Sequence, residues 1–123
     1  KFKLNKYKNG VLDASTKQID KLAPVITFCG IGNDINFINQ LNKMNITIKR
    51  QFSFENHARY NHTKYQQLKN ANPNNLSFIT TYKDFVKLDE SFKMKYTIYV
   101  LEMNVDLNDE KLINKIKELV NEN

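Results

Sequence analysis

The sequence predicts an α/β fold with three α/β/α layers: a small, mostly parallel, Rossmann-like sheet of about five strands with helices on both faces. Two observations predict it. Short apolar runs alternate with amphipathic stretches along the 123 residues. One of these runs, VITFCG at residues 25–30, is continuous and ends in glycine, which is typical of a buried parallel strand. Strands that alternate with helices favour a parallel sheet covered on its faces.

Period and turn residues identify the first elements. Residues 2–7, FKLNKY, alternate with a period of two and lead into Asn9-Gly10, so they are predicted to form an exposed strand before a turn. Residues 33–45 favour a helix, because four apolar side chains recur there at helical spacing. The predicted buried face of that helix comprises Ile35, Ile38, Leu41 and Met44.

The remaining elements continue the alternation. A short helix is predicted to stop at the sequence NPNN, and the last helix has Asn108 as its N-cap with acidic residues in its first turn. The predicted strands are residues 46–54, 76–81 and 95–103, and the predicted helical segments are residues 62–71, 82–88 and 108–123.

Composition limits the classes of function. With 41% hydrophobic and 26% charged residues, the chain is typical of one globular domain. Its net charge of +6 favours anionic partners, namely nucleic acid, phosphorylated ligands or an anionic membrane surface. Cys29 is the only cysteine, which excludes an internal disulfide and a cysteine-rich zinc site. No apolar stretch approaches 18 residues, the length that a membrane-spanning helix needs.

Three polar loops are predicted to meet at one edge of the sheet. They are CGIGND at residues 29–34, SFENHARYNH at residues 53–62 and ITTYKD at residues 79–84. Right-handed crossovers place every strand-to-helix loop along the same edge. Ligands of open α/β sheets gather there, at the carboxyl ends of the strands.

The loop GIGN suits an anion. Gly30 and Gly32 permit close backbone approach, and the helix that follows offers free N–H groups. The dinucleotide fingerprint requires a third glycine where this chain has Ile35, which disfavours a nicotinamide cofactor. A tight turn without a ligand is an equally good interpretation.

The second and third loops each allow several interpretations. His57 and His62 lie five residues apart near Glu55, a spacing that does not fit the usual zinc pattern, so acid/base or hydrogen-bonding work is favoured over metal binding. Two solvated histidines remain an alternative. In ITTYKD, the threonines can cap the next helix, and Lys83 and Asp84 can bind phosphate or form a surface ion pair.

The three loops together resemble a known family. VITFCGIGNDINFINQL is similar to a strand followed by G-I-x-N-P-x-x-F, FENHARY resembles F-P-D-H-H-x-Y, and ITTYKDFVKL resembles T-T-E-K-D-A-V-K-L. These are motifs of tetraacyldisaccharide 4'-kinase, the lipid A 4'-kinase of Gram-negative bacteria. The resemblance covers about residues 22–88 closely. The chain departs from it at Asp34, Asn56, Ala58 and Tyr82, which stand where the family has Pro, Asp, His and Glu.

The resemblance implies a two-lobed enzyme of which this is the smaller C-terminal lobe. Residues 22–123 correspond to that lobe, and residues 1–21 to a connecting strand and linker. A larger N-terminal P-loop lobe carries the ATP and Mg²⁺ ligands, the catalytic base and the contact with the membrane. The family reaction transfers the γ-phosphoryl group of ATP to the 4'-hydroxyl of lipid A disaccharide 1-phosphate, at the cytoplasmic face of the inner membrane. No GxxxxGK[ST] phosphate loop occurs here, so the fragment is expected to bind no cofactor and to be inactive alone.

The resemblance also implies roles for individual residues. His57 is expected to support or position the reacting groups, Gly30 and Gly32 to form a backbone anion loop, and no residue to bind metal. Residues expected near substrate or phosphate are Asn33, Asn56, Arg59, Tyr60, Thr80, Thr81, Lys83 and Asp84. His62 and Glu55 are expected to be plain surface residues. Two alternatives stay open: a stand-alone basic module that binds nucleic acid or phosphate, and a small metal-dependent hydrolase. The kinase interpretation implies no nucleic-acid partner.

Overall fold

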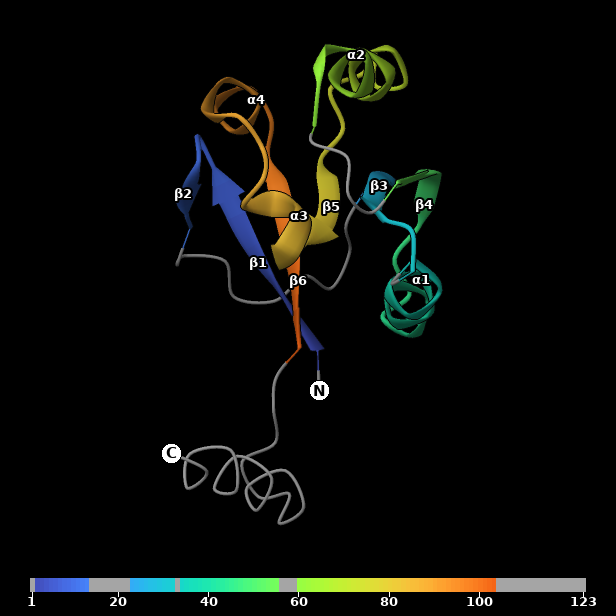
Figure 1. Cartoon of the computed structure of the whole chain (residues 1–123). Helices are drawn as coiled ribbons and strands as arrows, with labels where there is room; N and C mark the ends of the chain where they lie inside the picture. The colour runs from blue at the N-terminus through green and yellow to red at the C-terminus, as the bar shows by residue number, and fades with distance from the viewer. Residues whose placement is uncertain (1, 14–22, 33, 56–59, 104–123) are drawn as a thin grey trace, which may run out of the picture.

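The computed structural model describes residues 2–13, 23–32, 34–55 and 60–103 (Figure 1). These residues form a six-stranded sheet in the order β2-β1-β6-β5-β3-β4. The strands are β1 (Phe2–Lys8), β2 (Val11–Leu12), β3 (Val25–Gly30), β4 (Ile48–Phe54), β5 (Phe78–Thr81) and β6 (Ile98–Met103). The pairs β3–β4, β3–β5 and β5–β6 are parallel, whereas β1 pairs antiparallel with β6 and with β2. The predicted α/β class and mostly parallel sheet are confirmed.

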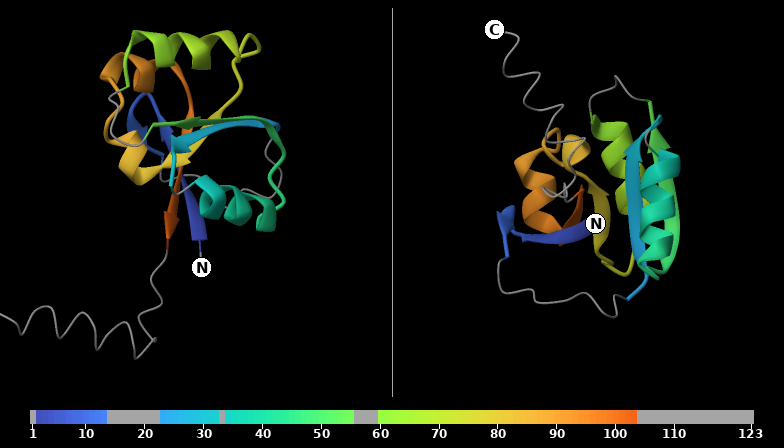
Figure 2. Two further views of the ribbon diagram at one scale, coloured as in Figure 1. Left: turned by 45° about the vertical axis from the view of Figure 1, so that its right-hand side comes forward. Right: turned by 90° about the horizontal axis from the view of Figure 1, so that it is seen from below.

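Helices cover both faces of the sheet. They are α1 (Asp34–Lys43), α2 (His62–Asn70), α3 (Tyr82–Phe85) and α4 (Glu90–Lys95). In the left view of Figure 2, α1 lies below the β3–β4 pair and α2 lies above it. Alternate side chains of β3 follow this division: Ile26 and Phe28 pack in the core that includes Leu68 of α2, and Val25 packs with Phe37 of α1. Period two in the strands therefore produces two separate cores.

The first strand is less exposed than predicted. Asn9 and Gly10 connect β1 to β2 with φ angles of 55° and 77°, as a two-residue hairpin turn requires, so the predicted turn is confirmed. However, β1 is flanked by β2 and β6, and Leu4 and Tyr7 are half-buried against the two cores. Strand β1 thus extends the sheet, and the connecting role expected for residues 1–21 stays a prediction.

Helix α1 packs through most of the predicted face, with Phe37 buried in place of Ile35. Phe37 and Leu41 are its buried residues, with Ile38 and Met44 partly buried beside them, whereas Ile35 is 72% exposed. Ile35 and Phe37 lie two positions apart, so a helix cannot bury both on one narrow face. The larger aromatic side chain faces the sheet, and the prediction for Ile35 was wrong.

The segment after β5 forms two short helices. The predicted helical turn at residues 82–88 is α3, and α4 follows it without having been predicted. Both pack on the α2 side, where Phe85, Phe92 and Tyr96 are buried. Helix α4 is only six residues long, which leaves little helical period in the sequence to detect.

Within the described parts of the chain, no helix has the length and apolar character needed to cross a lipid bilayer.

Candidate functional site

The predicted meeting of three loops occurs at the carboxyl ends of β3, β4 and β5, here called the carboxyl edge. Because these strands are parallel and adjacent through β3, their ends lie at the same side of the sheet. Helix α1 follows β3 on one face, and α3 and α4 follow β5 on the other. Neighbouring strands whose connections leave to opposite faces define the position where open α/β sheets bind ligands.

A buried carboxyl group joins the three loops. Asp84 is 7% exposed and accepts hydrogen bonds from three groups: the Gly30 amide at 3.3 Å, the Tyr60 hydroxyl at 3.0 Å and the Thr81 hydroxyl at 2.5 Å. Each donor comes from a different loop. We call these four residues the Asp84 cluster. Its bonds satisfy a polar group that would be costly to bury alone.

Tyr60 takes part in the cluster only as a hydrogen-bond donor. Burial, and then the nearby Asp84 carboxylate, raise the pKa of its hydroxyl above the usual tyrosine value. The ring packs edge-on against Phe28 and Phe54, with centroids 5.7 and 5.6 Å away. A protonated, buried tyrosine fixed on both its ring and its hydroxyl cannot act as a base.

The amides expected to hold an anion are engaged inside the protein. The Gly30 N–H donates to Asp84, the Ile31 N–H to the Phe54 carbonyl at 2.7 Å, and the Gly32 N–H to Asp34 at 3.3 Å. Gly32 has a φ of 109°, a conformation that favours glycine. In this conformation the loop is a tight turn, the alternative that the sequence left open, and its three amides are not free for phosphate.

Asp34 has a defined place at the start of α1. Besides the Gly32 amide, it accepts a hydrogen bond from the Ser53 hydroxyl at 3.1 Å. This bond from Ser53, followed by the backbone amides, lowers the pKa of the Asp34 carboxyl. A negative charge therefore lies directly after the GIGN turn at neutral pH, where the family has a proline, and it disfavours an anion further.

The ITTYKD loop divides into buried and exposed side chains. The buried Thr80 hydroxyl donates to the Phe28 carbonyl at 2.7 Å and so ties β5 to β3. Thr81 caps α3 by accepting from the Asp84 amide at 3.2 Å, as predicted. Lys83 is exposed. Asp84 is turned inward, so the two side chains expected to act together lie in different environments.

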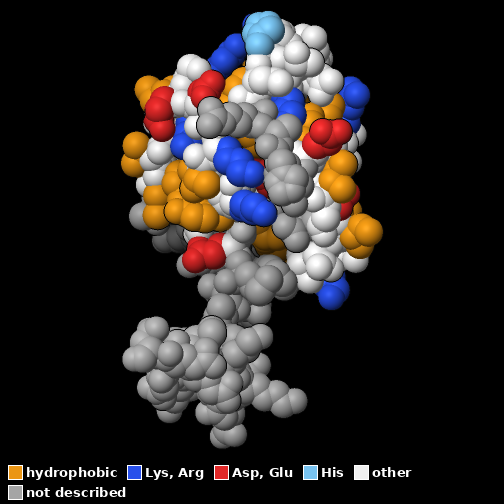
Figure 3. Space-filling view, in the orientation of Figure 1, with side chains coloured by type: hydrophobic (Ala, Val, Ile, Leu, Met, Phe, Trp, Pro, Cys, Tyr) orange, Lys and Arg blue, Asp and Glu red, His pale blue; other side chains and the backbone are white. Residues whose placement is uncertain are grey.

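The exposed part of this region combines charge with apolar surface. Lys83 and Lys87 are exposed, as are Tyr82 and Val86 between and beside them. Figure 3 shows basic side chains next to an apolar area on the face that carries α3. Among the candidate residues that the structure describes, Lys83 is therefore the one whose charged side chain remains available to an anion in solution.

Four of the predicted residues lie outside the described residues: Asn33, Asn56, His57 and Arg59. Their roles stay predictions. The described neighbours on either side of residues 56–59 are well held, since Phe54 and Tyr60 are both buried. Glu55 and His62 are exposed, as predicted for surface residues.

The described part of the chain has a surface hollow of about 400 Å³. Ile31, Ser53, Glu55, Asn61 and Lys64 contribute to its lining, so it lies at the end of β4 and the start of α2. A smaller hollow of about 200 Å³ lies between α2 and α4. Lys69 and Lys95, in the last turns of those helices, line the smaller one, which places it away from the carboxyl edge.

No group of three or more metal-ligating side chains comes together among the residues that the structure describes. His57 lies outside this set, so the donors of the metal-dependent alternative are only partly represented. The expectation of no metal ligand stays a prediction.

Sequence reasoning identified the loops but missed how they are joined. The Asp84 cluster links residues that are up to 54 positions apart, and no spacing rule reveals such a contact. The hydrogen bond from Ser53 to Asp34 was missed for the same reason. The available signal was Asp84 itself, a carboxylate three residues after the buried strand β5, and the sequence pattern was interpreted as phosphate binding or a surface ion pair.

Cys29 is expected to be unreactive in the folded chain. It is fully buried, and desolvation raises the pKa of its thiol to about 12. Because thiolate is the reactive form, a disulfide reagent such as Ellman's should label the native chain at pH 8 on the order of a hundredfold more slowly than the urea-unfolded chain. Cys29 is the only cysteine, so the signal has one source. Equal rates would contradict its burial.

Comparison with known proteins now decides the family. A family model described as LpxK, tetraacyldisaccharide-1-P 4'-kinase, matches residues 1–121. The chain belongs to this family. The resemblance found in the three loops is therefore confirmed. In this member of the tetraacyldisaccharide-1-P 4'-kinase family, the Asp84 cluster joins those loops.

Individual relatives agree. The tetraacyldisaccharide 4'-kinase of Vibrio campbellii is 30% identical over 112 residues, which cover 88% of this chain and 32% of that protein. That of Pelagibacter ubique is 30% identical over 108 residues, which cover 86% of this chain and 34% of that protein. The chain thus spans about a third of the length of these curated relatives.

A solved structure shares the fold. The "apo" form of LpxK from Aquifex aeolicus, crystallised in complex with ATP, superposes with a TM-score of 0.60 at 22% identity. The match covers 97% of this chain and 36% of that chain. It supports the α/β architecture described above.

Proposed function

We propose that this chain is the C-terminal lobe of a tetraacyldisaccharide 4'-kinase. The whole enzyme transfers the γ-phosphoryl group of ATP to the 4'-hydroxyl of tetraacyldisaccharide 1-phosphate in lipid A biosynthesis. The observation that carries this proposal is the family match over residues 1–121 together with the motif-bearing loops that meet at the carboxyl edge. Relatives about three times as long leave room for a second lobe.

ATP and Mg²⁺ fit poorly on the described part of this lobe. The amides of Gly30, Ile31 and Gly32 are already donated to protein acceptors. Asp84 is buried and already accepts three hydrogen bonds from the protein. The 123 residues contain no GxxxxGK[ST] loop. We therefore assign both the nucleotide and its metal to the N-terminal P-loop lobe and derive no step through them here.

The contribution of this lobe is positioning across the cleft between lobes. Phosphoryl transfer depends on placement and electrostatics more than on covalent chemistry by the protein. His57 lies in the segment between Phe54 and Tyr60, which are fixed at the carboxyl edge. Lys83 is exposed at the same edge and offers a positive charge for a phosphate. In the whole enzyme, His57 supports the catalytic carboxylate or the acceptor sugar.

The chemistry of the proposed substrate indicates where the whole enzyme acts. The acceptor is an acylated disaccharide, so the whole enzyme acts at a membrane surface, which we assign to the cytoplasmic face of the inner membrane. The contact with lipid is assigned to the N-terminal lobe. The net charge of +6 on this chain is suited to a phosphorylated acceptor at an anionic surface.

The test compares the full-length protein with the 123-residue chain. Each is incubated with radiolabelled ATP, Mg²⁺ and tetraacyldisaccharide 1-phosphate, and the 4'-phosphorylated lipid is separated and counted. We expect product from the full-length protein and none from the 123 residues, because the chain has no phosphate loop. Turnover by the chain alone contradicts its assignment as a lobe. A folded full-length protein without turnover contradicts the proposed reaction.

A further inference from the structure

We propose that the surface over α3 is a contact with anionic lipid, in addition to the contact assigned to the N-terminal lobe. This surface, here called the α3 patch, consists of neighbouring apolar and basic side chains: Leu12, Tyr82, Lys83, Val86 and Lys87. The partner is a bilayer surface with anionic headgroups. The inference goes beyond the proposed reaction, and the measurements that test it do not involve turnover.

Helix α3 and the turn after it present an apolar and a basic stripe to solvent. Tyr82 and Val86 lie four positions apart, and the Val86 amide donates to the Tyr82 carbonyl at 3.1 Å, so their side chains share one face. Lys83 and Lys87, each one residue further along, form the neighbouring stripe. All four side chains are exposed, whereas Phe85 is buried beneath them. One short segment therefore combines apolar surface with positive charge.

Strand β2 extends the apolar part of the patch. Leu12 pairs directly with Tyr7 across the β1–β2 hairpin, so the two side chains lie on the same face of the sheet. On that face the Tyr7 ring packs on Phe85 of α3, with centroids 4.3 Å apart. Burial, and then the nearby Tyr82 and Glu102 side chains, raise the pKa of the Tyr7 hydroxyl. Leu12 and Tyr82 therefore both adjoin Tyr7, and both are more than half exposed.

The two lysines of the patch are available to an anionic surface. Both are exposed, and neither forms an ion pair with another described residue. Figure 3 shows basic side chains beside an apolar area on this face. Lipid phosphates complement such lysines, and tyrosine, valine and leucine side chains favour the boundary between headgroups and acyl chains.

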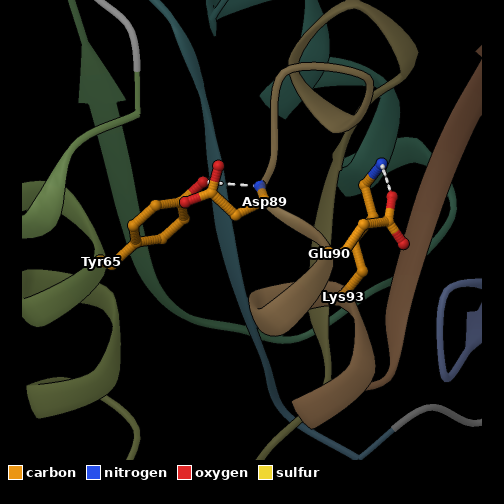
Figure 4. Close-up of polar contacts among 4 residues, drawn as sticks. All are labelled: Tyr65, Asp89, Glu90 and Lys93. Atoms are coloured by element: carbon orange, nitrogen blue, oxygen red, sulfur yellow. Dashed lines mark hydrogen bonds and ion pairs between the residues drawn. The ribbon is translucent and has the colours of Figure 1, made fainter.

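Two acidic residues follow the patch at the start of α4, and neither neutralises its lysines. Glu90 forms an ion pair with Lys93, whose Nζ lies 3.6 Å from Oε1 (Figure 4). Asp89 lies beside Tyr65 of α2, where its amide donates to the tyrosine hydroxyl at 2.8 Å. Neither carboxylate pairs with Lys83 or Lys87. The positive charge of the patch is therefore available to a partner.

A lipid surface suits this patch better than a protein surface does. Lysine is depleted in protein–protein interfaces, whereas a bilayer leaves the ammonium groups among the phosphates and takes up only the apolar side chains. The patch also adjoins the carboxyl edge, because α3 directly follows β5. Under the proposed function, this contact holds the candidate site close to the membrane that contains the acylated acceptor.

The experiment measures how the full-length protein partitions onto vesicles in a flotation assay. The vesicles are phosphatidylcholine alone, or phosphatidylcholine with about one-third phosphatidylglycerol as the anionic lipid. The patch variant carries Val86→Asp and Lys87→Gln. The control variant carries Ile35→Asp and Lys43→Gln on α1, which covers the opposite face of the sheet and exposes both residues. Each variant loses one exposed apolar side chain and changes the net charge equally.

We expect the patch variant to partition about tenfold less onto the anionic vesicles, because each basic residue at the surface strengthens binding. The control variant should stay within about twofold of wild type, since charges further than about 10 Å from the lipid are screened by salt. Neutral vesicles should bind wild type and both variants equally. The comparison thus separates the position of the charges from their number.

Hydrogen exchange locates the contact within the wild-type protein. Anionic vesicles should slow exchange in peptides that cover residues 82–88, and neutral vesicles should not. Peptides of α1 should exchange at the same rate with and without vesicles. Without vesicles, the peptides of β3 and β5 should be equally protected in wild type and in the patch variant, which shows that the fold is intact.

Several results would overturn the lipid contact. Equal binding of wild type and the patch variant to anionic vesicles, equal losses in both variants, or unchanged exchange at residues 82–88 each do so. A lower melting temperature of the patch variant with unchanged vesicle binding also overturns it, and indicates that the N-terminal lobe covers the patch. Kinase activity is measured separately, so a failure of the proposed reaction leaves these measurements decisive.

Discussion

In the full-length protein, His57→Ala is expected to lower turnover at saturating ATP by about tenfold to a hundredfold. His57 is the histidine of the FENHARY motif, and two described residues of that motif, Phe54 and Tyr60, make hydrogen bonds at the carboxyl edge. A positioning hydrogen bond to a charged group contributes about 1.5–3 kcal/mol, which converts to that factor in rate. The assay is 4'-phosphorylation of tetraacyldisaccharide 1-phosphate, with circular dichroism to show that the fold is intact.

The chain offers its own control for this substitution. His62 is the only other histidine, and it is exposed at the first position of α2. His62→Ala should keep turnover within about twofold, because changes at exposed positions rarely exceed half a kcal/mol. Equal losses from both substitutions, or no loss from His57→Ala, contradict the placement of His57 at the reacting groups.

The loss of the motif carboxylate makes this result informative. The family pairs the motif histidine with a preceding Asp, and this chain has Asn56 there. An amide can accept a hydrogen bond from the imidazole but does not raise its basicity as a carboxylate does. Asn56→Asp, which restores the carboxylate of the family motif, is therefore a useful variant to measure beside His57→Ala. We therefore propose that His57 positions the reacting groups and does not act as the base. His57→Ala tests that positioning role.

The strands could be predicted from sequence because their patterns are local. Residues 25–30 are apolar on both faces, and in the structure the two faces enter separate cores. The Asn9-Gly10 turn is similarly local, since two residues at positive φ produce it. These features depend on neighbouring residues only, which is the information that a single sequence contains.

The wrong predictions concern side chains whose burial is determined by tertiary contacts. Ile35 and Phe37 compete for the face of α1 that meets the sheet, and only packing determines that the ring is buried. Asp84 follows a buried strand in a polar loop, a pattern shared by surface ion pairs. Its burial depends on donors from Gly30 and Tyr60, far away in the sequence. The loops of the candidate site were predictable, whereas the bonds between them were not.

The stability of this arrangement depends on an aromatic core beneath the carboxyl edge. Phe28 is fully buried, and three rings surround it edge-on: Tyr60, Phe78 and Phe92, with centroids 5.7, 5.8 and 6.3 Å away. They come from the segment before α2, from β5 and from α4. Phe28 therefore joins the elements that carry the second and third loops, and its own carbonyl accepts from Thr80.

Phe28→Ala is expected to lower the free energy of unfolding by about 3–5 kcal/mol, since it leaves a ring-sized cavity in a closely packed core. Urea unfolding of the chain, followed by circular dichroism, measures the change. Ile35→Ala is the control: the side chain is 72% exposed on a helix, so its loss should change the free energy by no more than about 0.5 kcal/mol. A cost for Ile35→Ala that approaches that of Phe28→Ala would indicate that Ile35 is buried, as the sequence pattern predicted. An unchanged free energy of unfolding in Phe28→Ala would contradict the aromatic core and its role in supporting the carboxyl edge.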